Sequence, residues 1–329
     1  NDSLKRIDYI DLIISSNKLT KKLNYDDSNV NPSMGNATTR IYSISYLKNG
    51  VLQKKYIYTY DGNHNITSVV VENASGLTSE QYNYKYDGFN QLIREDYNDG
   101  TTSFSKTFSY DSNGNIISIK TYEYTLGEIY EEITPILEEN KFYYRNDWKD
   151  QILRIEYYLN GYLQYYQNFE YDPSGNVTGI TDSRGECEEY IWEGRNLVGV
   201  GEDISYTYND QGIRTEKKVN GIITDYYLDG SRVLYEKSVN EIPGEIIDII
   251  YYTYDVDGSL LSMNLNGDEY FYIRNLQGDI IELVDISGDS VVQYSYDAWG
   301  NIVNTLDTSD VSLSTKNPYR YRGYRYDEE

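Results

Sequence analysis

The chain is poor in several residue types on which other classes of protein depend. Its 329 residues include three alanines (Ala37, Ala74 and Ala298), one histidine and one cysteine. Because alanine is the best helix former, whereas aromatic and β-branched residues favour strands, we expect few helices. The single cysteine, Cys187, cannot form an internal disulfide. No apolar run is long enough for a transmembrane helix, and no segment resembles a signal peptide.

Positive charge is also scarce. The chain has 29 basic against 53 acidic residues, so its formal net charge is −24. A polyanion of this size is repelled by phosphate backbones and by anionic lipid surfaces. We therefore expect neither a nucleic-acid partner nor membrane insertion by this segment.

Tyrosine is abundant, with 40 copies, and many copies belong to one repeated unit. The unit is a strand with alternating tyrosines, then an aspartate, then a short turn rich in glycine and asparagine, then an aliphatic strand. Consecutive copies at Tyr60, Tyr86 and Tyr110 are 26 and 24 positions apart, which is enough for two ordinary strands and two turns. Further clear copies lie at Tyr171, Tyr254 and Tyr296, and looser ones at Tyr144, Trp192, Tyr208 and Tyr272.

The chemistry of the unit predicts one β-hairpin per repeat. In Tyr82-Asn83-Tyr84-Lys85-Tyr86 the three tyrosines share one face of a strand. The aspartate after the strand can accept hydrogen bonds from the amides just ahead of it, and the following glycine or asparagine tolerates positive φ. Tyrosine offers apolar area and still forms hydrogen bonds, which suits a single curved sheet that is wet on both sides.

The predicted fold is therefore all-β, with tandem β-hairpin repeats in a spiralling single-layer sheet or a hollow shell. Residues 1–42 are less regular, and we expect an irregular entry segment there with one or two strands and a long loop. Residues 43–329 form the repeat region.

These residues resemble the YD-repeat (Rhs-repeat) proteins, a family that includes bacterial Rhs and wall-associated polymorphic toxins, subunits of insecticidal toxin complexes, and animal teneurins. The resemblance covers roughly Ser43 to Glu329. It is sharpest near the C-terminus, where three motifs resemble the approach to the Rhs-associated core: Tyr272-Ile273-Arg274-Asn275-Leu276-Gln277-Gly278-Asp279-Ile280, Tyr294-Ser295-Tyr296-Asp297-Ala298-Trp299-Gly300-Asn301, and Asn317-Pro318-Tyr319-Arg320-Tyr321-Arg322-Gly323-Tyr324.

The resemblance implies a shell that encloses or carries a C-terminal toxin domain, in a secreted or wall-associated bacterial protein. We expect targeting signals, the cleavage aspartates and the toxin domain to lie outside this sequence, so that the segment itself is not an enzyme. Its partners are then the polypeptide cargo and the rest of its own chain, with a surface glycan or receptor as the alternative. The expected structural motif residues are Tyr60, Asp61, Tyr86, Asp87, Tyr110, Asp111, Tyr171, Asp172, Tyr254, Asp255, Tyr296, Asp297, Gly300, Pro318, Arg320, Tyr321 and Gly323.

Few residues point to catalysis or cofactor binding. His64 is the only histidine, and it lies in a predicted turn. Catalysis by a Ser-His-Asp or Cys-His arrangement is therefore not expected. Cys187 is flanked by Glu186 and Glu188, and their negative charge disfavours a thiolate. Carboxylates are numerous enough for a glycosidase pair, but they recur at turns, which is typical of structural residues. We predict no catalytic residue and no cofactor.

Two binding hypotheses compete with purely structural interpretations. The segments beginning at Asp111 and Asp255 resemble the start of a calcium loop, but Tyr122 and Asn266 stand where an EF-hand has its bidentate glutamate. We therefore favour turn chemistry and predict no metal site. The tyrosine rows could stack on sugar rings, as in a carbohydrate-binding or adhesion module, although packing between neighbouring strands explains them as well.

Overall fold

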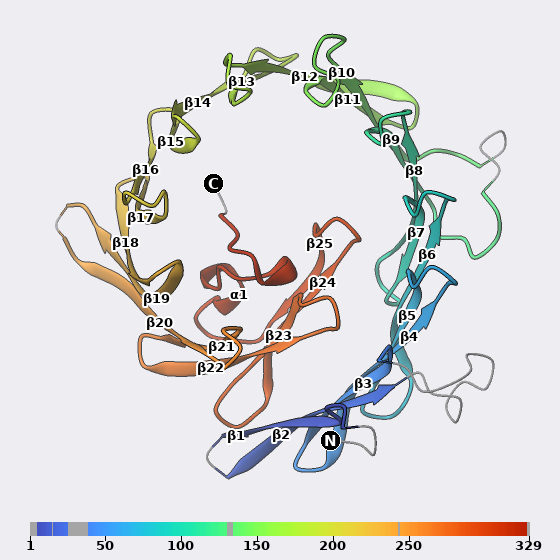
Figure 1. The fold of residues 1–329 in the computed structure, drawn as a ribbon, viewed down its shortest axis with the longest axis vertical. Coiled ribbons are helices and arrows are strands. Elements are labelled where there is room, and N and C mark those ends of the chain that lie inside the picture. Colours follow the sequence, from blue (N-terminus) through green and yellow to red (C-terminus); the bar gives the residue numbers. More distant parts are fainter. Residues whose placement is uncertain (1–4, 15, 26–38, 130–133, 243, 328–329) are drawn as a thin grey trace. The chain divides into compact units, whose positions relative to one another are not determined.

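The computed structural model describes residues 5–14, 16–25, 39–129, 134–242 and 244–327. It is nearly all β, with 61% strand and 2% helix, which confirms the predicted fold class. Figure 1 shows the elements in chain order. The strands are β1 (Tyr9–Ile14), β2 (Asn17–Tyr25), β3 (Ile41–Lys48), β4 (Val51–Tyr60), β5 (Ile66–Asn73), β6 (Thr78–Tyr86), β7 (Leu92–Asn98), β8 (Ser103–Tyr110), β9 (Ile116–Tyr122), β10 (Glu138–Tyr144), β11 (Ile152–Leu159), β12 (Tyr162–Tyr171), β13 (Val177–Asp182), β14 (Cys187–Glu193), β15 (Asn196–Val200), β16 (Ile204–Tyr208), β17 (Arg214–Val219), β18 (Ile222–Asp229), β19 (Arg232–Asn240), β20 (Ile246–Tyr254), β21 (Leu260–Leu265), β22 (Asp268–Arg274), β23 (Ile280–Val284), β24 (Ser290–Tyr296) and β25 (Ile302–Asp307).

Two short helical segments follow the last strand. They are α1 (Leu313–Lys316) and the 3-10 turn η2 (Tyr321–Gly323). Within the described ranges no helix combines the length and apolar character needed to cross a membrane.

Strands that follow one another along the chain pair antiparallel as hairpins, as in β4 with β5 and β20 with β21. The pairing register shifts by one residue at the last tyrosine of several strands. Such a shift, a β-bulge, bends the strand and increases its twist. The shift recurs at Tyr60, Tyr86, Tyr144, Tyr171, Tyr208, Tyr254 and Tyr296. The tyrosine-aspartate motif thus marks a bent strand end.

The chain divides into two compact units. Unit 1 comprises residues 1–108, 121–135 and 273–326, and unit 2 comprises residues 109–120, 136–272 and 327–329. Each is described by itself below.

Unit 1 has a closely packed core between two parts of the chain that are far apart in sequence. Its buried cluster contains Ile44, Tyr58, Val71 and Tyr97 from the N-terminal strands, together with Ile281 from β23. The Tyr58 hydroxyl accepts a hydrogen bond from the Leu276 amide. The C-terminal hairpins therefore cover one face of β3–β8, a second layer that the repeat pattern does not predict.

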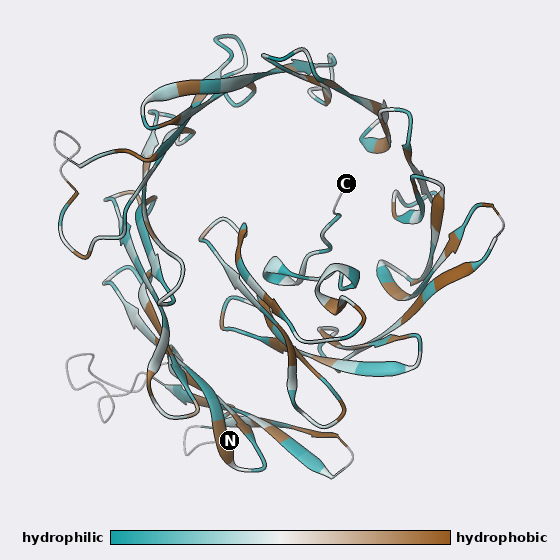
Figure 2. Cartoon of the chain, turned by 180° about the vertical axis from the view of Figure 1, so that it is seen from behind, coloured by the Kyte–Doolittle hydropathy of each residue, from teal (hydrophilic) through white to brown (hydrophobic). Residues whose placement is uncertain are grey.

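Unit 2 has long stretches of sheet with little burial. No residue of β10, β11 or β12 is fully buried, so both faces of these strands retain contact with solvent. Hydrophilic and hydrophobic residues are interspersed along the strands in Figure 2. This arrangement fits the prediction that tyrosine serves a sheet that is wet on both sides.

The entry region contains two strands, β1 and β2. Most of the loop expected around Asn29–Thr39 lies outside the described residues. Strand β3 begins at Ile41, so the boundary drawn after residue 42 falls inside a strand. The entry segment and the first repeat are continuous there because β2 pairs directly with β3.

Candidate functional site

The tyrosine-aspartate turns share one hydrogen-bond pattern, which the turn after β12 illustrates. Asp172 Oδ1 accepts hydrogen bonds from the backbone amides of Ser174 at 2.8 Å and Asn176 at 2.9 Å. Its other oxygen, Oδ2, accepts one from Asn176 Nδ2 at 2.8 Å. Gly175 has a φ of +91°, and its amide donates to the Asp172 carbonyl. One carboxylate thus fixes the whole turn.

The same two amide bonds form at every clear copy of the motif. An aspartate oxygen accepts from the second and fourth following amides at Asp61, Asp87, Asp111, Asp172, Asp255 and Asp297. Asn209 and Asn275 make equivalent bonds through Oδ1 in the looser copies. The accepted hydrogen bonds favour the ionised form, and the bond from the Asn176 amide is the main cause that lowers the pKa of Asp172.

The tyrosine before each turn connects its repeat to the preceding one. Its hydroxyl donates a hydrogen bond to the carbonyl of an aliphatic residue at or near the start of an earlier strand. Donor and acceptor are Tyr60 and Ile41, Tyr86 and Ile66, Tyr144 and Ile116, Tyr171 and Ile152, Tyr208 and Leu197, Tyr254 and Val233, and Tyr296 and Ile280. At the looser copy Trp192, the indole Nε1 donates to the Val177 carbonyl instead. We call this series the hydroxyl ladder. Tyr110 is the last residue of β8.

Removing one bond of the hydroxyl ladder is expected to have a measurable but modest effect. The change Tyr171→Phe leaves the Ile152 carbonyl without the 2.8 Å bond, and a neutral hydrogen bond contributes about 1 kcal/mol. We expect the free energy of unfolding to fall by that amount in urea denaturation. Tyr162→Phe is the control, because this side chain is 76% exposed. Equal effects of the two changes would contradict a special role for the ladder.

Asparagines in the turns add a second connection between repeats. Asn65 Nδ2 donates to Asn90 Oδ1 in the next turn at 2.9 Å, and Asn176 Nδ2 donates to the Gly194 carbonyl at 3.0 Å. The motif therefore stabilises its own turn and also contacts the neighbouring one.

Strand β7 carries a set of buried charges that was not predicted from the sequence. Arg94, Glu95 and Asp96 are 4%, 0% and 5% exposed. Alternation along the strand places Glu95 on one face and its two neighbours on the other. The available signal was three consecutive charged residues within a strand, but it is not specific, because β17 also carries three, Glu216-Lys217-Lys218, and none of these is buried.

Glu95 faces the C-terminal hairpin β24–β25. Its Oε1 accepts a hydrogen bond from the Ala298 amide at 2.7 Å, while Oε2 is buried with no hydrogen-bond partner among the described residues. The Asp297 carboxylate lies nearby and forms a 2.9 Å ion pair with Lys106. Burial is the main cause that raises the pKa of Glu95 to about 8, and the charge of Asp297 adds to it. Glu95 is therefore largely protonated at neutral pH.

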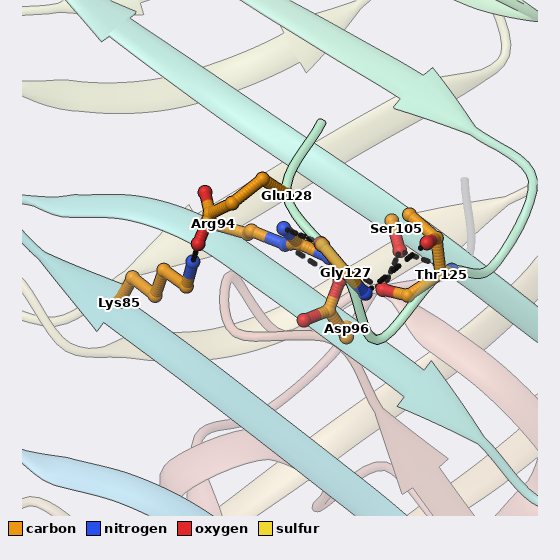
Figure 3. Close-up of polar contacts among 7 residues, drawn as sticks. All are labelled: Lys85, Arg94, Asp96, Ser105, Thr125, Gly127 and Glu128. Carbon is orange, nitrogen blue, oxygen red and sulfur yellow. Dashed lines mark hydrogen bonds and ion pairs between the residues drawn. The ribbon is translucent and has the colours of Figure 1, made fainter. Parts of the chain in front are cut away.

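Arg94 and Asp96, on the other face of β7, bind a connecting segment (Figure 3). Arg94 donates hydrogen bonds to the carbonyls of Thr125 and Gly127 and pairs with Asp96 at 2.8 Å. Ser105 Oγ accepts from the Thr125 amide at 3.1 Å. Residues 125–127, named here the strap, thus cover β7 and β8.

Loss of the guanidinium is expected to release the strap. In Arg94→Lys the lysine lacks the planar guanidinium and cannot donate to both carbonyls at once. Hydrogen bonds to charged groups contribute roughly 1.5–3 kcal/mol. Amide hydrogen exchange in the strap should therefore accelerate at least about tenfold. Hydrogen exchange read by mass spectrometry over residues 121–129 measures this change.

An exposed ion pair nearby supplies the control. Lys85 and Glu128 are 2.8 Å apart, but their side chains are 47% and 67% exposed. Because such pairs contribute little, Lys85→Met should leave the exchange nearly unchanged. A strap that stays protected in Arg94→Lys would show that it is held by other contacts.

The C-terminal motif of unit 1 is folded back onto the last hairpins. The Arg320 carbonyl accepts a hydrogen bond from the Ile280 amide at 3.0 Å, and the Tyr321 hydroxyl donates to the Ala298 carbonyl at 3.0 Å. The Pro318 carbonyl accepts from the Tyr326 amide, and Gly323 has a φ of +68°. The C-terminal motif residues Pro318, Arg320, Tyr321 and Gly323 are therefore brought together here.

Gly300 lies directly beneath the Tyr321 ring. Its φ is +91°, and a Cβ atom added to it would lie 2.5 Å from Tyr321 Cδ1. Glycine is thus required at this turn both by backbone conformation and by close approach.

The residues considered for catalysis and metal binding lie in a turn, on the surface or within the packed core. His64 has a φ of +69° in its turn and contacts Arg40 through Nδ1 at 3.0 Å. Cys187 is exposed. Glu95 and Asp297 form a carboxyl pair but are 0% and 3% exposed, too enclosed to meet a polymeric substrate. In the part of the chain that the structure describes, no group of three or more histidine, cysteine or acidic residues could hold a metal ion.

No family model matches the sequence. Two curated relatives are 32% identical to it, over 254 and 253 residues, in each case 74% of this chain. They are the tRNA3(Ser)-specific nuclease WapA of Bacillus spizizenii and the tRNA nuclease WapA of Bacillus subtilis. The chain spans about 9% of the length of each relative.

Among solved structures, the TcdB2-TccC3-Cdc42 complex aligns with 94% of this chain and 21% of its own, at 14% identity and a TM-score of 0.41. The Photorhabdus luminescens Tc holotoxin pore aligns with 95% of this chain and 20% of its own, at 13% identity and a TM-score of 0.40.

Proposed function

Because this chain belongs to the YD-repeat (Rhs-repeat) family, we propose that it is a wall segment of a larger toxin-associated shell that encloses or carries a C-terminal polypeptide domain. The observation that supports the proposal most strongly is the repeated turn with its hydroxyl ladder. In this ladder, tyrosine hydroxyls donate hydrogen bonds to backbone carbonyls of an earlier strand and so join successive hairpins. The repeated polar residues therefore stabilise the fold.

In this proposal the motif residues are structural. Tyr60, Tyr86, Tyr171, Tyr254 and Tyr296 belong to the hydroxyl ladder, Tyr110 ends a strand before the same type of turn, and the aspartate after each of these tyrosines fixes its turn. Gly300, Pro318, Arg320, Tyr321 and Gly323 hold the last hairpins. The segment itself catalyses no reaction.

The cargo is a toxin domain elsewhere in the full-length protein. Both curated relatives are named tRNA nucleases, and this chain spans only about 9% of each, so a nuclease activity would reside in another part of such a protein. We place the protein outside the bacterial cell, secreted or bound to the wall.

Mass spectrometry of the full-length gene product, purified from its native host, tests the proposal. We expect a C-terminal fragment that is cleaved yet remains bound, and that resists added protease until denaturant is present. The same protein denatured before protease addition is the control. An intact chain, or a fragment that is digested equally with and without denaturant, would contradict enclosure.

One observation favours adhesion as a second candidate function. Tyr227, Tyr235 and Tyr251 form a continuous stack across β18–β20, with ring centroids 4.0 and 5.1 Å apart. Tyr227 and Tyr251 are 43% and 51% exposed. Such an aromatic row can contact a glycan.

Glycan-array binding by the wild type and by Tyr251→Ala tests this alternative. Binding that Tyr251→Ala abolishes would support adhesion. No binding to any sugar would leave the stack as cross-strand packing.

A further inference from the structure

Three tyrosines stand directly opposite one another on neighbouring strands of unit 2. Tyr227 of β18 pairs with Tyr235 of β19, and Tyr235 pairs with Tyr251 of β20. Side chains at opposite positions of antiparallel strands contact each other on one face of the sheet. The rings of Tyr227 and Tyr235 are accordingly stacked, with centroids 4.0 Å apart and planes inclined by only 8°.

The hydroxyl groups of this pair lie side by side. Burial is the main cause that raises the pKa of Tyr235, and a side-chain hydrogen bond with Tyr227 adds to it. A tyrosine side chain has one polar atom, its phenolic oxygen, so this hydrogen bond joins the two hydroxyls. Because the rings are nearly parallel and their hydroxyls adjacent, the ortho carbons, which neighbour the hydroxyl-bearing carbon in each ring, also face one another.

The stack is open to solvent, and its hydroxyls differ from those of other tyrosines. Tyr227 and Tyr251 are 43% and 51% exposed. The hydroxyls of the hydroxyl ladder donate to backbone carbonyls instead. Tyr157 and Tyr165 also stack, at 4.3 Å and 16°, but the Tyr157 hydroxyl donates to Gln167 Oε1 at 2.8 Å. The stack on β18–β20 therefore combines ring overlap, adjacent hydroxyls and access from solvent.

We propose that Tyr227 and Tyr235 are a site of oxidative cross-linking, at which a haem peroxidase with hydrogen peroxide joins the two rings as dityrosine. Each phenol loses one electron and one proton, and the two radicals form a bond between their ortho carbons. The hydrogens on the bonded carbons then shift to the oxygens, which restores both phenols. Overall, two tyrosines and one hydrogen peroxide give one dityrosine and two water molecules.

The product joins β18 to β19 by a covalent bond. The single cysteine of the chain cannot supply such a link internally. The inference goes beyond the proposed function and does not depend on it, because it concerns a modification of the wall itself, whatever the wall encloses.

Peptide mapping after treatment of the folded protein with a haem peroxidase and hydrogen peroxide tests the proposal. Trypsin places the two tyrosines in different peptides, because peptide 219–232 contains Tyr227 and peptide 233–237 contains Tyr235 as its only tyrosine. We expect mass spectrometry to find these peptides linked, with a mass lower than their sum by two hydrogen atoms. Absence of the linked pair would overturn the proposal, whether or not other tyrosines are oxidised.

Two variants with intact rings show whether the assigned pair is the one that reacts. Tyr227→Phe keeps the stacked ring but removes the phenol, so the linked pair should be lost. Tyr162→Phe is the control, because Tyr162 is 76% exposed and lies outside the stack, and it should give as much linked product as the wild type. A linked pair that persists in Tyr227→Phe would identify Tyr226, in the same peptide and 6% exposed, as the reacting residue and contradict the assignment.

A mixture of unlabelled and isotopically labelled protein shows whether the bond forms within one chain. We expect both peptides of each linked pair to carry the same label, because the fold holds the two rings of one chain together. Mixed pairs as frequent as unmixed ones would show that the rings couple by collision between molecules, and the site would then not be built by the fold.

Discussion

The change Gly300→Ala is expected to destabilise unit 1 by about 2–5 kcal/mol. A residue with a side chain at positive φ costs roughly 1–2 kcal/mol, and overpacking costs roughly 1–3 kcal/mol. Both apply, because Gly300 has a φ of +91° and the added Cβ would lie 2.5 Å from the Tyr321 ring. Urea denaturation followed by the fluorescence of Trp299, which packs on Phe108 with ring centroids 5.9 Å apart, measures the change. The measurement is made in a background with Trp148→Phe and Trp192→Tyr, in which Trp299 is the remaining tryptophan, so that the fluorescence reports on unit 1.

Gly278 provides a matched control for the backbone contribution. It has the same φ of +91°, but no atom of the described residues lies within 4 Å of the position that an added Cβ would take there. Gly278→Ala should therefore show the conformational cost alone, roughly 1–2 kcal/mol. Adding Tyr321→Ala to Gly300→Ala should recover part of the steric cost, which appears as a coupling energy in the double-mutant cycle. Equal losses for Gly278→Ala and Gly300→Ala would show that the ring moves aside freely.

The change Glu95→Gln is expected to make the protein more stable at pH 8 and to leave it nearly unchanged at pH 4. The pKa of Glu95 rises from 4.5 to about 8 on folding, and at about 1.4 kcal/mol per pKa unit this corresponds to roughly 5 kcal/mol. The stability associated with the protonated carboxyl is fully present below the unfolded pKa. It decreases as pH rises from 4.5 towards 8, because the unfolded chain releases its proton first.

Glutamine removes this titration but keeps an oxygen that accepts the Ala298 amide. The difference in free energy of unfolding between Glu95→Gln and wild type, measured in urea at several pH values, should therefore grow between pH 4.5 and pH 8 and then level off. Other titrating groups cancel in this difference. Glu128→Gln, at a side chain that is 67% exposed, should show no such growth. A difference that is independent of pH would mean that Glu95 is ionised within the fold throughout the range.

The turns could be predicted from sequence because their interactions are local. Strands β4, β6 and β12 end at Tyr60, Tyr86 and Tyr171, where the motif places a strand stop. The aspartate contacts amides only two and four residues ahead, so the motif itself contains the whole interaction. The all-β class follows from the same repeated unit.

The second layer of unit 1 could not be predicted, because it depends on contacts between distant parts of the chain. Glu95 and Ala298 are 203 positions apart, and Lys106 and Asp297 are 191 apart. No repeat spacing indicates that a hairpin near the end of the chain covers β7. The strap could not be predicted either. Arg94 binds backbone carbonyls, and every residue has a carbonyl, so the sequence does not indicate which residues Arg94 contacts.

The hydroxyl ladder also bears on how the length of such proteins can change. Each ladder bond reaches back to a carbonyl, a group that every residue possesses, and the turn asparagines likewise contact backbone or a neighbouring turn. Consequently a hairpin can follow any other hairpin without matched side chains. In a chain where each unit contacts its neighbours, stability accumulates unit by unit. Within unit 2, duplication or loss of a whole repeat in the gene would therefore give another foldable wall, longer or shorter by one hairpin, without compensating substitutions in the neighbouring repeats.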